Sequence, residues 1–280
     1  MGQKSSAPPA PKVLGRRSDP CSERRIEDVC DIDRSGGPLG KGAFGTVWRA
    51  HLRDKRASTV AVKTLDKTLI TQKGFPPSQV FSEVELMHYF TGKGQFVQLY
   101  EFFDTPDTFF LVMEYCDGGD LVNATLENEG NLGDAQITRY MKQITKAIEH
   151  LHSNSICHRD IKPPNFMIVG NPASEQVKVK LGDFGLAVHL HGQLRRDKVG
   201  TPTFMAPEMH YLPAKSTGYD QKVDIWAMGV VMIFLLAHQY SLIDSSGEFM
   251  YDQLLHGSMP VWDRRFYSGL FQTPQESSGA

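Results

Sequence analysis

The stretch His158-Arg159-Asp160-Ile161-Lys162-Pro163-Pro164-Asn165 carries a carboxylate, an amine and an amide close together in the chain. Further on, Asp183-Phe184-Gly185 adds a second carboxylate beside a flexible glycine. This combination suits the transfer of a phosphoryl group from a nucleotide–Mg²⁺ complex to a hydroxyl group. That reaction depends on positioning, charge neutralisation and one base for the acceptor proton, and it needs little covalent chemistry from the protein.

A glycine-rich segment lies upstream of these residues. Gly40-Lys41-Gly42-Ala43-Phe44-Gly45-Thr46-Val47 matches the pattern G-x-G-x-x-G-x-V, whose glycines let a backbone turn close over phosphates without Cβ collisions. The pattern alone also fits an ordinary turn. In a dinucleotide-binding fold, a helix and an acidic residue about 20 positions on would follow. The next segment is instead β-rich and leads to Lys63 in Val60-Ala61-Val62-Lys63, which favours a phosphate-binding hairpin.

The bulk composition restricts the class of protein. The chain has 280 residues, 40% hydrophobic and 22% charged, which suffices for one large domain or for two lobes with their own cores. A formal net charge of -2 gives no basic footprint for nucleic acid. The four cysteines form no C-x-x-C pair and indicate reduced, intracellular thiols rather than a disulfide framework or a metal site.

The N-terminal segment predicts a weak membrane attachment. Met1-Gly2-Gln3-Lys4-Ser5-Ser6 fits the pattern for N-myristoylation of Gly2, and one acyl chain binds a bilayer only marginally. No secretory signal is present, and the richest apolar run, Trp226 to Ala237, is too short to span a membrane. We therefore expect a cytoplasmic protein that associates weakly with membranes. Residues 1–33, rich in Ser, Pro and charge, are predicted to form a flexible tail.

The periodicity of the remaining chain predicts strands first and helices afterwards. Residues 47–52, 59–63, 96–103 and 108–113 are expected to be strands, and 80–90 a helix between them. Residues 135–152 carry apolar side chains at helical spacing. The order predicts an α+β protein with two lobes, a β-rich lobe over 34–115 and a helical lobe over 116–280.

Taken together, these motifs resemble those of the eukaryotic serine/threonine protein kinases, most closely the calcium-dependent and calmodulin-dependent group. The resemblance runs from Gly36 to Ala237 and implies a bilobal fold, ATP and Mg²⁺ as cofactors, and protein substrates with Ser or Thr hydroxyls. Despite the resemblance to calcium-dependent kinases, we expect no calcium module in this sequence. Asp31-Ile32-Asp33 mimics the start of a calcium loop, but Gly42 stands where such a loop requires a bidentate Glu.

The same resemblance implies the roles of the site residues. Asp160 is the expected base, Lys162 neutralises charge on the γ-phosphate, and Thr201 bonds both. Asn165 and Asp183 are the expected Mg²⁺ ligands, consistent with the preference of hard cations for oxygen. Lys63 is expected to bind the α- and β-phosphates and to pair with an acid on the following helix, for which Glu83 is chosen over Glu85. The expected nucleotide-binding residues are Leu39, Gly40, Lys41, Gly42, Ala43, Phe44, Gly45, Thr46, Val47, Ala61, Lys63, Met113, Glu114, Cys116 and Met167. A buried stack of Met87, Leu99, His158 and Phe184 is also expected.

The sequence departs from the family pattern in the segment that follows Asp183. Between Phe184 and Gly200 it contains no Ser, Thr or Tyr, and Asp197 occupies the usual phosphorylation site. We expect Asp197 to pair with Arg159 in place of a phosphate. Pro164 stands where kinases directed to basic sequences have Glu, so Asp120 alone supports a mild preference for basic substrates.

The second departure lies at the end of the chain. The resemblance fades after Ala237, one further helix is expected over 247–256, and the helical lobe is expected to be shortened. The arginine that normally pairs with Glu208 is absent. Glu208 then pairs with Arg264 or Arg265, or is exposed, or leaves the lobe less stable. The alternative function, which this departure favours, is a nucleotide-binding scaffold of kinase-like fold with weak or no transfer activity.

Overall fold

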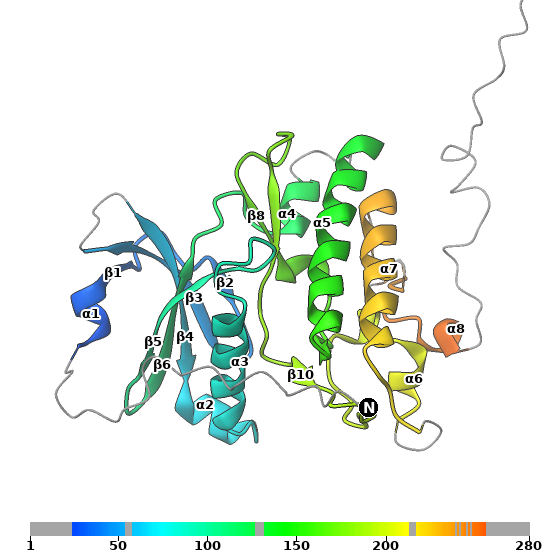
Figure 1. Ribbon diagram of the computed structural model, residues 1–280, viewed down its shortest axis with the longest axis horizontal. Coiled ribbons are helices and arrows are strands. Elements are labelled where there is room, and N and C mark those ends of the chain that lie inside the picture. The colour runs from blue at the N-terminus through cyan, green and yellow to red at the C-terminus, as the bar shows by residue number, and fades with distance from the viewer. Residues whose placement is uncertain are drawn as a thin grey trace, which may run out of the picture.

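The structure, a computed structural model, describes residues 24–53, 58–126, 132–212 and 217–255, apart from 239, 241, 245 and 247. The chain forms two lobes (Figure 1): a strand-rich lobe in blue to cyan, and a helical lobe in green to orange. The predicted α+β architecture with strands before helices is therefore confirmed.

The small lobe is built on an antiparallel sheet in the order β1-β3-β4-β6-β5. The strands are β1 (Cys30–Asp33), β3 (Gly45–Leu52), β4 (Thr59–Asp66), β6 (Thr108–Glu114) and β5 (Leu99–Asp104), and β2 (Gly40–Lys41) adds to β3. The register pairs Val47 with Lys63 and Ala61 with Met113. Strand pairing therefore brings together residues that the sequence predicted for one nucleotide site.

Two helices pack on this sheet. Helix α2 (Lys67–Gln72) begins at Asp66, whose carboxylate accepts hydrogen bonds from the amides of Thr68 and Leu69 at 2.7 and 3.0 Å. This is an N-cap, which satisfies amides at the helix start that have no partner within the helix. Helix α3 (Ser78–Tyr89) overlaps the predicted helix 80–90, ends one residue before it, and buries one face, which includes Glu83 and Met87.

The predicted flexible tail is wrong for its last residues. Ile26–Val29 form a short helix, α1, that leads directly into β1. Ile26, Val29 and Cys30 are buried against the sheet, because their spacing places all three on one side of the chain. Residues 1–23, and with them the predicted acylation of Gly2, lie outside the described residues.

The large lobe is mostly helical. Its helices are α4 (Leu121–Leu126), α5 (Asp134–Ser153), α6 (Pro207–His210), α7 (Lys222–Ala237) and α8 (Tyr251–Leu255), and α5 and α7 lie side by side (Figure 1). Short strand pairs, β8 (Phe166–Val169) with β9 (Lys178–Leu181) and β7 (Ile156–Cys157) with β10 (Val188–His189), frame the loops between helices. Two 3₁₀ turns, Pro163–Asn165 and Pro202–Phe204, complete the described elements.

Helix α7 is apolar on most of its circumference, as expected of a helix inside a core. No helix in the described ranges has the length and apolar character needed to cross a bilayer. Helix α8 is shorter than the predicted segment 247–256, and the expected shortening of the lobe after it falls outside the described residues.

Candidate active site

A cleft of about 1230 Å³ opens between the two lobes, and every residue predicted for nucleotide binding lines it. Leu39 through Val47 form the wall from the small lobe, together with Ala61 and Lys63. Met113, Glu114 and Cys116 line the connection between the lobes, and Met167 lies on the large lobe. Asp160, Lys162, Asn165, Asp183 and Glu83 line the same cleft.

Lys63 joins two carboxylates at the inner end of the cleft. Its Nζ lies 2.7 Å from Oε1 of Glu83 and 3.1 Å from Oδ1 of Asp183. Burial opposes the charge on Lys63, but the carboxylates of Asp183 and Glu83 outweigh it and hold the pKa of Lys63 above its ordinary value. Lys63 in turn lowers the pKa of Asp183 to about 2, so Asp183 is ionised at neutral pH. The choice of Glu83 as the partner of Lys63 agrees with this geometry.

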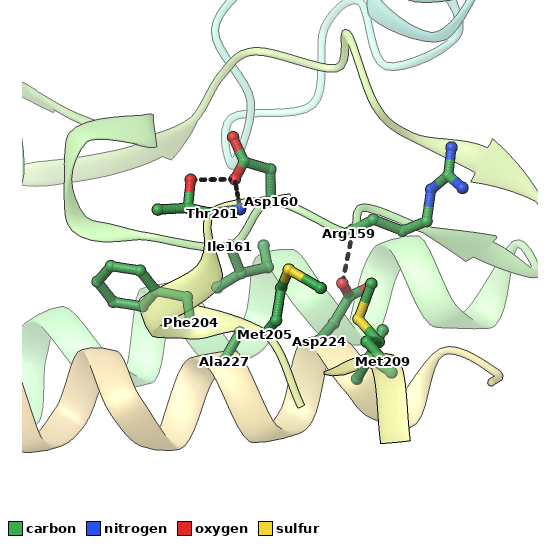
Figure 2. A pocket seen from close by; sticks show the side chains of 10 residues that line it. Arg159, Asp160, Ile161, Thr201, Phe204, Met205, Met209, Asp224 and Ala227 are labelled. Atoms are coloured by element: carbon green, nitrogen blue, oxygen red, sulfur yellow. Dashed lines mark hydrogen bonds between the residues drawn. The ribbon is translucent and has the colours of Figure 1, made fainter. Parts of the chain in front are cut away.

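Asp160, Lys162 and Thr201 form a closed triangle of polar contacts, and Figure 2 shows the side of it between Thr201 and Asp160. The Thr201 hydroxyl donates to Asp160 Oδ1 at 2.7 Å and accepts from Lys162 Nζ at 2.9 Å. Lys162 Nζ also lies 2.8 Å from Asp160 Oδ2. The backbone amide of Thr201 adds a hydrogen bond of 3.1 Å to Asp160 Oδ1. The carboxylate is therefore held in one orientation at the cleft.

The donor set at the cleft fits a hard divalent cation. Asn165 donates its amide nitrogen to the backbone carbonyl of Asp160 at 2.8 Å. Among the residues that the structure describes, the side-chain oxygen of Asn165 accepts no hydrogen bond. The ionised carboxylate of Asp183, half-exposed in the same cleft, supplies further oxygen. Oxygen ligands of this kind suit Mg²⁺, which takes one or two protein oxygens and completes its shell with phosphates and water.

The backbone of the catalytic loop, residues 158–165, is anchored from below by α7. Asp224, buried in that helix, accepts hydrogen bonds of 2.8 Å from the amides of both His158 and Arg159. Figure 2 shows the bond to Arg159, with Phe204, Met205 and Met209 around a small cavity. Arg159 adopts φ 68°, a left-handed conformation that costs a non-glycine residue energy and persists where the surroundings fix it. Asp224 provides that support.

Arg159 also reaches the activation segment, which begins at Asp183. Its guanidinium donates to the Asp197 carboxylate and to the Tyr219 hydroxyl, and Arg195 donates to the other oxygen of Asp197 at 3.0 Å. The Tyr219 hydroxyl donates to the backbone carbonyl of Asp197 at 2.8 Å. Partial burial opposes ionisation of Asp197, but the two arginines lower its pKa below the ordinary value. The expected pairing of Asp197 with Arg159 is confirmed.

Phe184 is buried in the core between the lobes. Its ring lies 5.5 Å from the His158 ring and 5.8 Å from those of Phe90 and Phe96. Met87 and Leu99 belong to the same buried cluster, so the residues of the expected stack are all buried. This packing fixes the neighbouring Asp183 in the cleft.

Three contacts at the site were not predicted from sequence. Lys180 is buried on β9, and its Nζ lies 2.6 Å from Oε1 of Glu114. This pair joins β9 to the segment that connects the two lobes. Gln79 donates to the Gly185 carbonyl at 2.7 Å. Lys73 donates at 2.7 Å to the carbonyl of Ala43, at the tip of the glycine-rich segment 40–47, here called the phosphate loop. Lys178 is exposed and Lys180 is buried, although positions two apart on a strand share a face, so strand periodicity offered no signal for the Lys180 contact.

Glu208 is half-buried and has no side-chain partner in the described part of the chain. Arg264 and Arg265, considered as partners for it, lie outside the described residues. Because the side chain is partly exposed, water can solvate the Glu208 carboxylate and reduce the cost of leaving it unpaired.

Comparison with known proteins identifies the family. The sequence profile described as "Protein kinase domain" matches residues 34–272. A probable myosin light chain kinase of Dictyostelium discoideum is 33% identical over 226 residues, 80% of this chain and 53% of the relative. Serine/threonine-protein kinase 33 of Mus musculus is 30% identical over 255 residues, 85% of this chain and 50% of the relative. Calcium-dependent protein kinase 27 of Oryza sativa subsp. japonica is 28% identical over 237 residues, 84% of this chain and 37% of the relative.

The chain thus spans about half the length, or less, of these curated relatives. The profile match covers most of the chain and includes both lobes that form the cleft. This chain belongs to the protein kinase domain family, among the eukaryotic serine/threonine protein kinases.

Proposed function

We propose that this chain transfers the γ-phosphoryl group of ATP to serine or threonine hydroxyls of protein substrates. One observation carries the proposal: the Thr201 hydroxyl bridges Asp160 and Lys162 at 2.7 and 2.9 Å while Lys63 is paired with Glu83 at 2.7 Å. One conformation therefore holds both the proposed base, Asp160, and the proposed phosphate-binding residue, Lys63, in the arrangement that phosphoryl transfer requires.

Asp160 acts as the acceptor of the substrate proton. The oxygen–phosphorus bond to the substrate hydroxyl forms as the bond between the γ-phosphorus and the β,γ-bridging oxygen breaks, and the hydroxyl proton passes to Asp160. The contacts from Thr201 fix the carboxylate, so its position requires no reorganisation during the reaction. Lys162, beside Asp160, neutralises charge on the transferred group.

Lys63, Asn165 and Asp183 position the nucleotide. Lys63 binds the α- and β-phosphates and is itself held by Glu83. Asn165 and Asp183 would hold Mg²⁺, which would supply positive charge that neutralises the phosphates. Val47, Ala61 and Met167 line the apolar part of the cleft and enclose the adenine ring.

Lys162 and Thr201 support serine and threonine, rather than tyrosine, as acceptors, and the name of the mouse relative, serine/threonine-protein kinase 33, agrees. The preference for basic sequences rests on Asp120, which lines the cleft and is half-buried. The Asp120 carboxylate also accepts from the Asn123 amide at 2.8 Å, which caps α4 and reduces its capacity to bind a substrate arginine. We therefore infer only a mild preference for basic residues.

The activation segment holds its position without phosphorylation. Asp197 occupies the place of a phosphoamino acid and is bonded by Arg159 and Arg195 from two sides. A carboxylate carries less charge than a phosphate but keeps hydrogen bonds of the same kind. The proposal is constitutive order in this segment, with no upstream kinase required.

The test is transfer of labelled phosphate from ATP–Mg²⁺ to a generic basic protein, with Asp160→Asn as the matched variant. We expect incorporation that is lost in the variant while both proteins keep the same thermal stabilisation by nucleotide. No incorporation by a folded preparation that binds nucleotide overturns the proposal and favours a nucleotide-binding scaffold.

A further inference from the structure

The tip of the phosphate loop, Ala43-Phe44, is bonded to the connection between α2 and α3. Lys73 Nζ donates to the Ala43 carbonyl at 2.7 Å, and its ammonium group lies 5.5 Å from the centre of the Phe44 ring. The rings of Phe44 and Phe75 have centroids 4.5 Å apart, a favourable aromatic contact. The backbone amide of Asp66 adds a hydrogen bond of 3.0 Å to the Phe44 carbonyl. The loop tip is therefore attached to residues outside its own hairpin.

The α2–α3 connection is a firm support for these contacts. The amide of Lys73 bonds the Leu69 carbonyl at 3.1 Å, and the amide of Phe75 bonds the Ile70 carbonyl at 3.0 Å, so both residues are fixed to α2. Pro76 and Pro77 follow and restrict the backbone before α3 begins. Phe75 thus stands on a segment with little freedom of its own.

The loop itself needs such a support. Gly42 and Gly45 close its turn with a backbone hydrogen bond of 2.8 Å, and glycine gives this segment many alternative conformations. Gly45 cannot be replaced, because a Cβ there would lie 1.7 Å from the Thr64 carbonyl oxygen. Gly45 is thus required for this close backbone approach and offers no side chain to hold the tip, whose position depends on contacts made beyond it.

We propose that Lys73 and Phe75 are positioning residues that hold the phosphate loop in its nucleotide-binding arrangement before the nucleotide arrives. The proposal rests on the proposed function, since the loop is taken to cover the phosphates of ATP. The contacts described join Lys73 and Phe75 to Ala43 and Phe44, and Phe75 also lines the cleft. Each acts through Ala43 and Phe44, and each reduces the ordering that nucleotide binding would otherwise require.

The same connection leads to a contact with the segment Asp183-Phe184-Gly185, which carries one of the predicted Mg²⁺ ligands. Beyond its prolines, Gln79 on α3 donates to the Gly185 carbonyl at 2.7 Å, directly after Asp183-Phe184. Lys73, Phe75 and Gln79 therefore form one segment that contacts the phosphate loop at one end and the activation segment at the other. Loss of the Lys73 or Phe75 contact releases the loop tip and leaves the Gln79 contact in place.

The first experiment measures amide hydrogen exchange over residues 40–47 in the chain without nucleotide. Lys73→Ala and Phe75→Leu are expected to speed exchange of the Gly42 amide roughly threefold to tenfold, in line with the usual strength of such contacts. Lys73→Arg keeps a donor and is expected to stay near the original rate. Lys93→Ala, which removes an exposed lysine after α3, serves as the control.

The second experiment titrates a fluorescent ATP analogue with Mg²⁺ into the same proteins. Weaker binding in Lys73→Ala and Phe75→Leu, by a similar factor and with unchanged thermal unfolding, supports the proposal, and KM for ATP should rise more than kcat falls. Unchanged exchange in the loop overturns it whatever the activity, and so does unchanged or tighter nucleotide binding. Because the exchange measurement needs no nucleotide, failure of the proposed kinase activity would leave its outcome readable.

Discussion

The guanidinium group of Arg159, in the catalytic loop, is hydrogen-bonded to the carboxylate of Asp197, which lies 38 residues further along the chain in the activation segment. The contact connects the loop that carries Asp160 to the segment that carries Thr201. Arg195 and Tyr219 complete the set of contacts around Asp197. These contacts hold Asp197, and with it this part of the activation segment, through residues of the chain itself.

Asp197→Ala should lower kcat/KM at least about tenfold, because hydrogen bonds between charged groups contribute about 1.5–3 kcal/mol each. Asp197→Glu should retain much of the activity, since the carboxylate remains. Phosphatase treatment of the original protein should leave phosphate transfer to a basic protein unchanged. Activity that falls on phosphatase treatment would show that a phosphorylated residue, and not Asp197, orders the segment.

Thr201→Ala should reduce kcat by roughly 10- to 100-fold, because it removes the hydroxyl that holds Asp160 and Lys162. Thr201→Ser keeps the hydroxyl and should restore most of the rate. The measurement is steady-state transfer with saturating ATP–Mg²⁺, in which nucleotide affinity should change little. Equal losses in the Ala and Ser variants would contradict a role for the hydroxyl.

The buried pair of Lys180 and Glu114 predicts a large effect on stability. Lys180→Met leaves Glu114 without its charged partner and should lower the free energy of unfolding by about 3–5 kcal/mol. Adding Glu114→Gln should recover part of that loss, because the unpaired charge is removed. Urea unfolding measures both effects. The matched control is Lys178→Met on the same strand, whose side chain is exposed and whose effect should stay within about 0.5 kcal/mol.

His210 predicts a dependence of stability on pH. It is buried in α6, where burial lowers its pKa below the ordinary value. The unfolded chain therefore binds a proton on His210 at a pH where the folded chain does not, and stability falls as the pH drops through about 6.5. Urea unfolding at several values between about pH 5 and 7.5 should show a smaller slope for His210→Gln. Equal slopes for His210→Gln and the original protein would contradict the assignment.

Motif order predicted the centre of this site well because each motif is short and its residues are local in the chain. Asp160, Lys162 and Asn165 share one loop, so their proximity follows from sequence alone. Lys63 with Glu83 followed from the resemblance, and the geometry agrees. The strands and long helices were found within a few residues, since their apolar spacing is set by the sheet and helix periods.

Other features could not be predicted because they depend on the path of the chain in space. The segment from Ile26 to Asp33 looked too charged to fold, yet its few apolar residues cover the back of the sheet. Lys73 meets Ala43 only because α2 and its connection turn under the phosphate loop. Periodicity did not mark Lys180 as buried, because it predicts the same face for the exposed Lys178, and no local pattern identifies Glu114 as its partner.

The anchoring of the catalytic loop by Asp224 has a consequence for synthesis on the ribosome. The amide of His158 precedes its acceptor by 66 residues, so the loop leaves the ribosome long before α7 exists. Chains emerge from the N-terminus, and an early segment stays without its later partners until these are made. During that interval the small lobe can pair its strands, but the loop that carries Asp160 lacks the hydrogen bonds from Asp224. Asp224 can therefore hold the catalytic loop only after α7 has been synthesised and has left the ribosome.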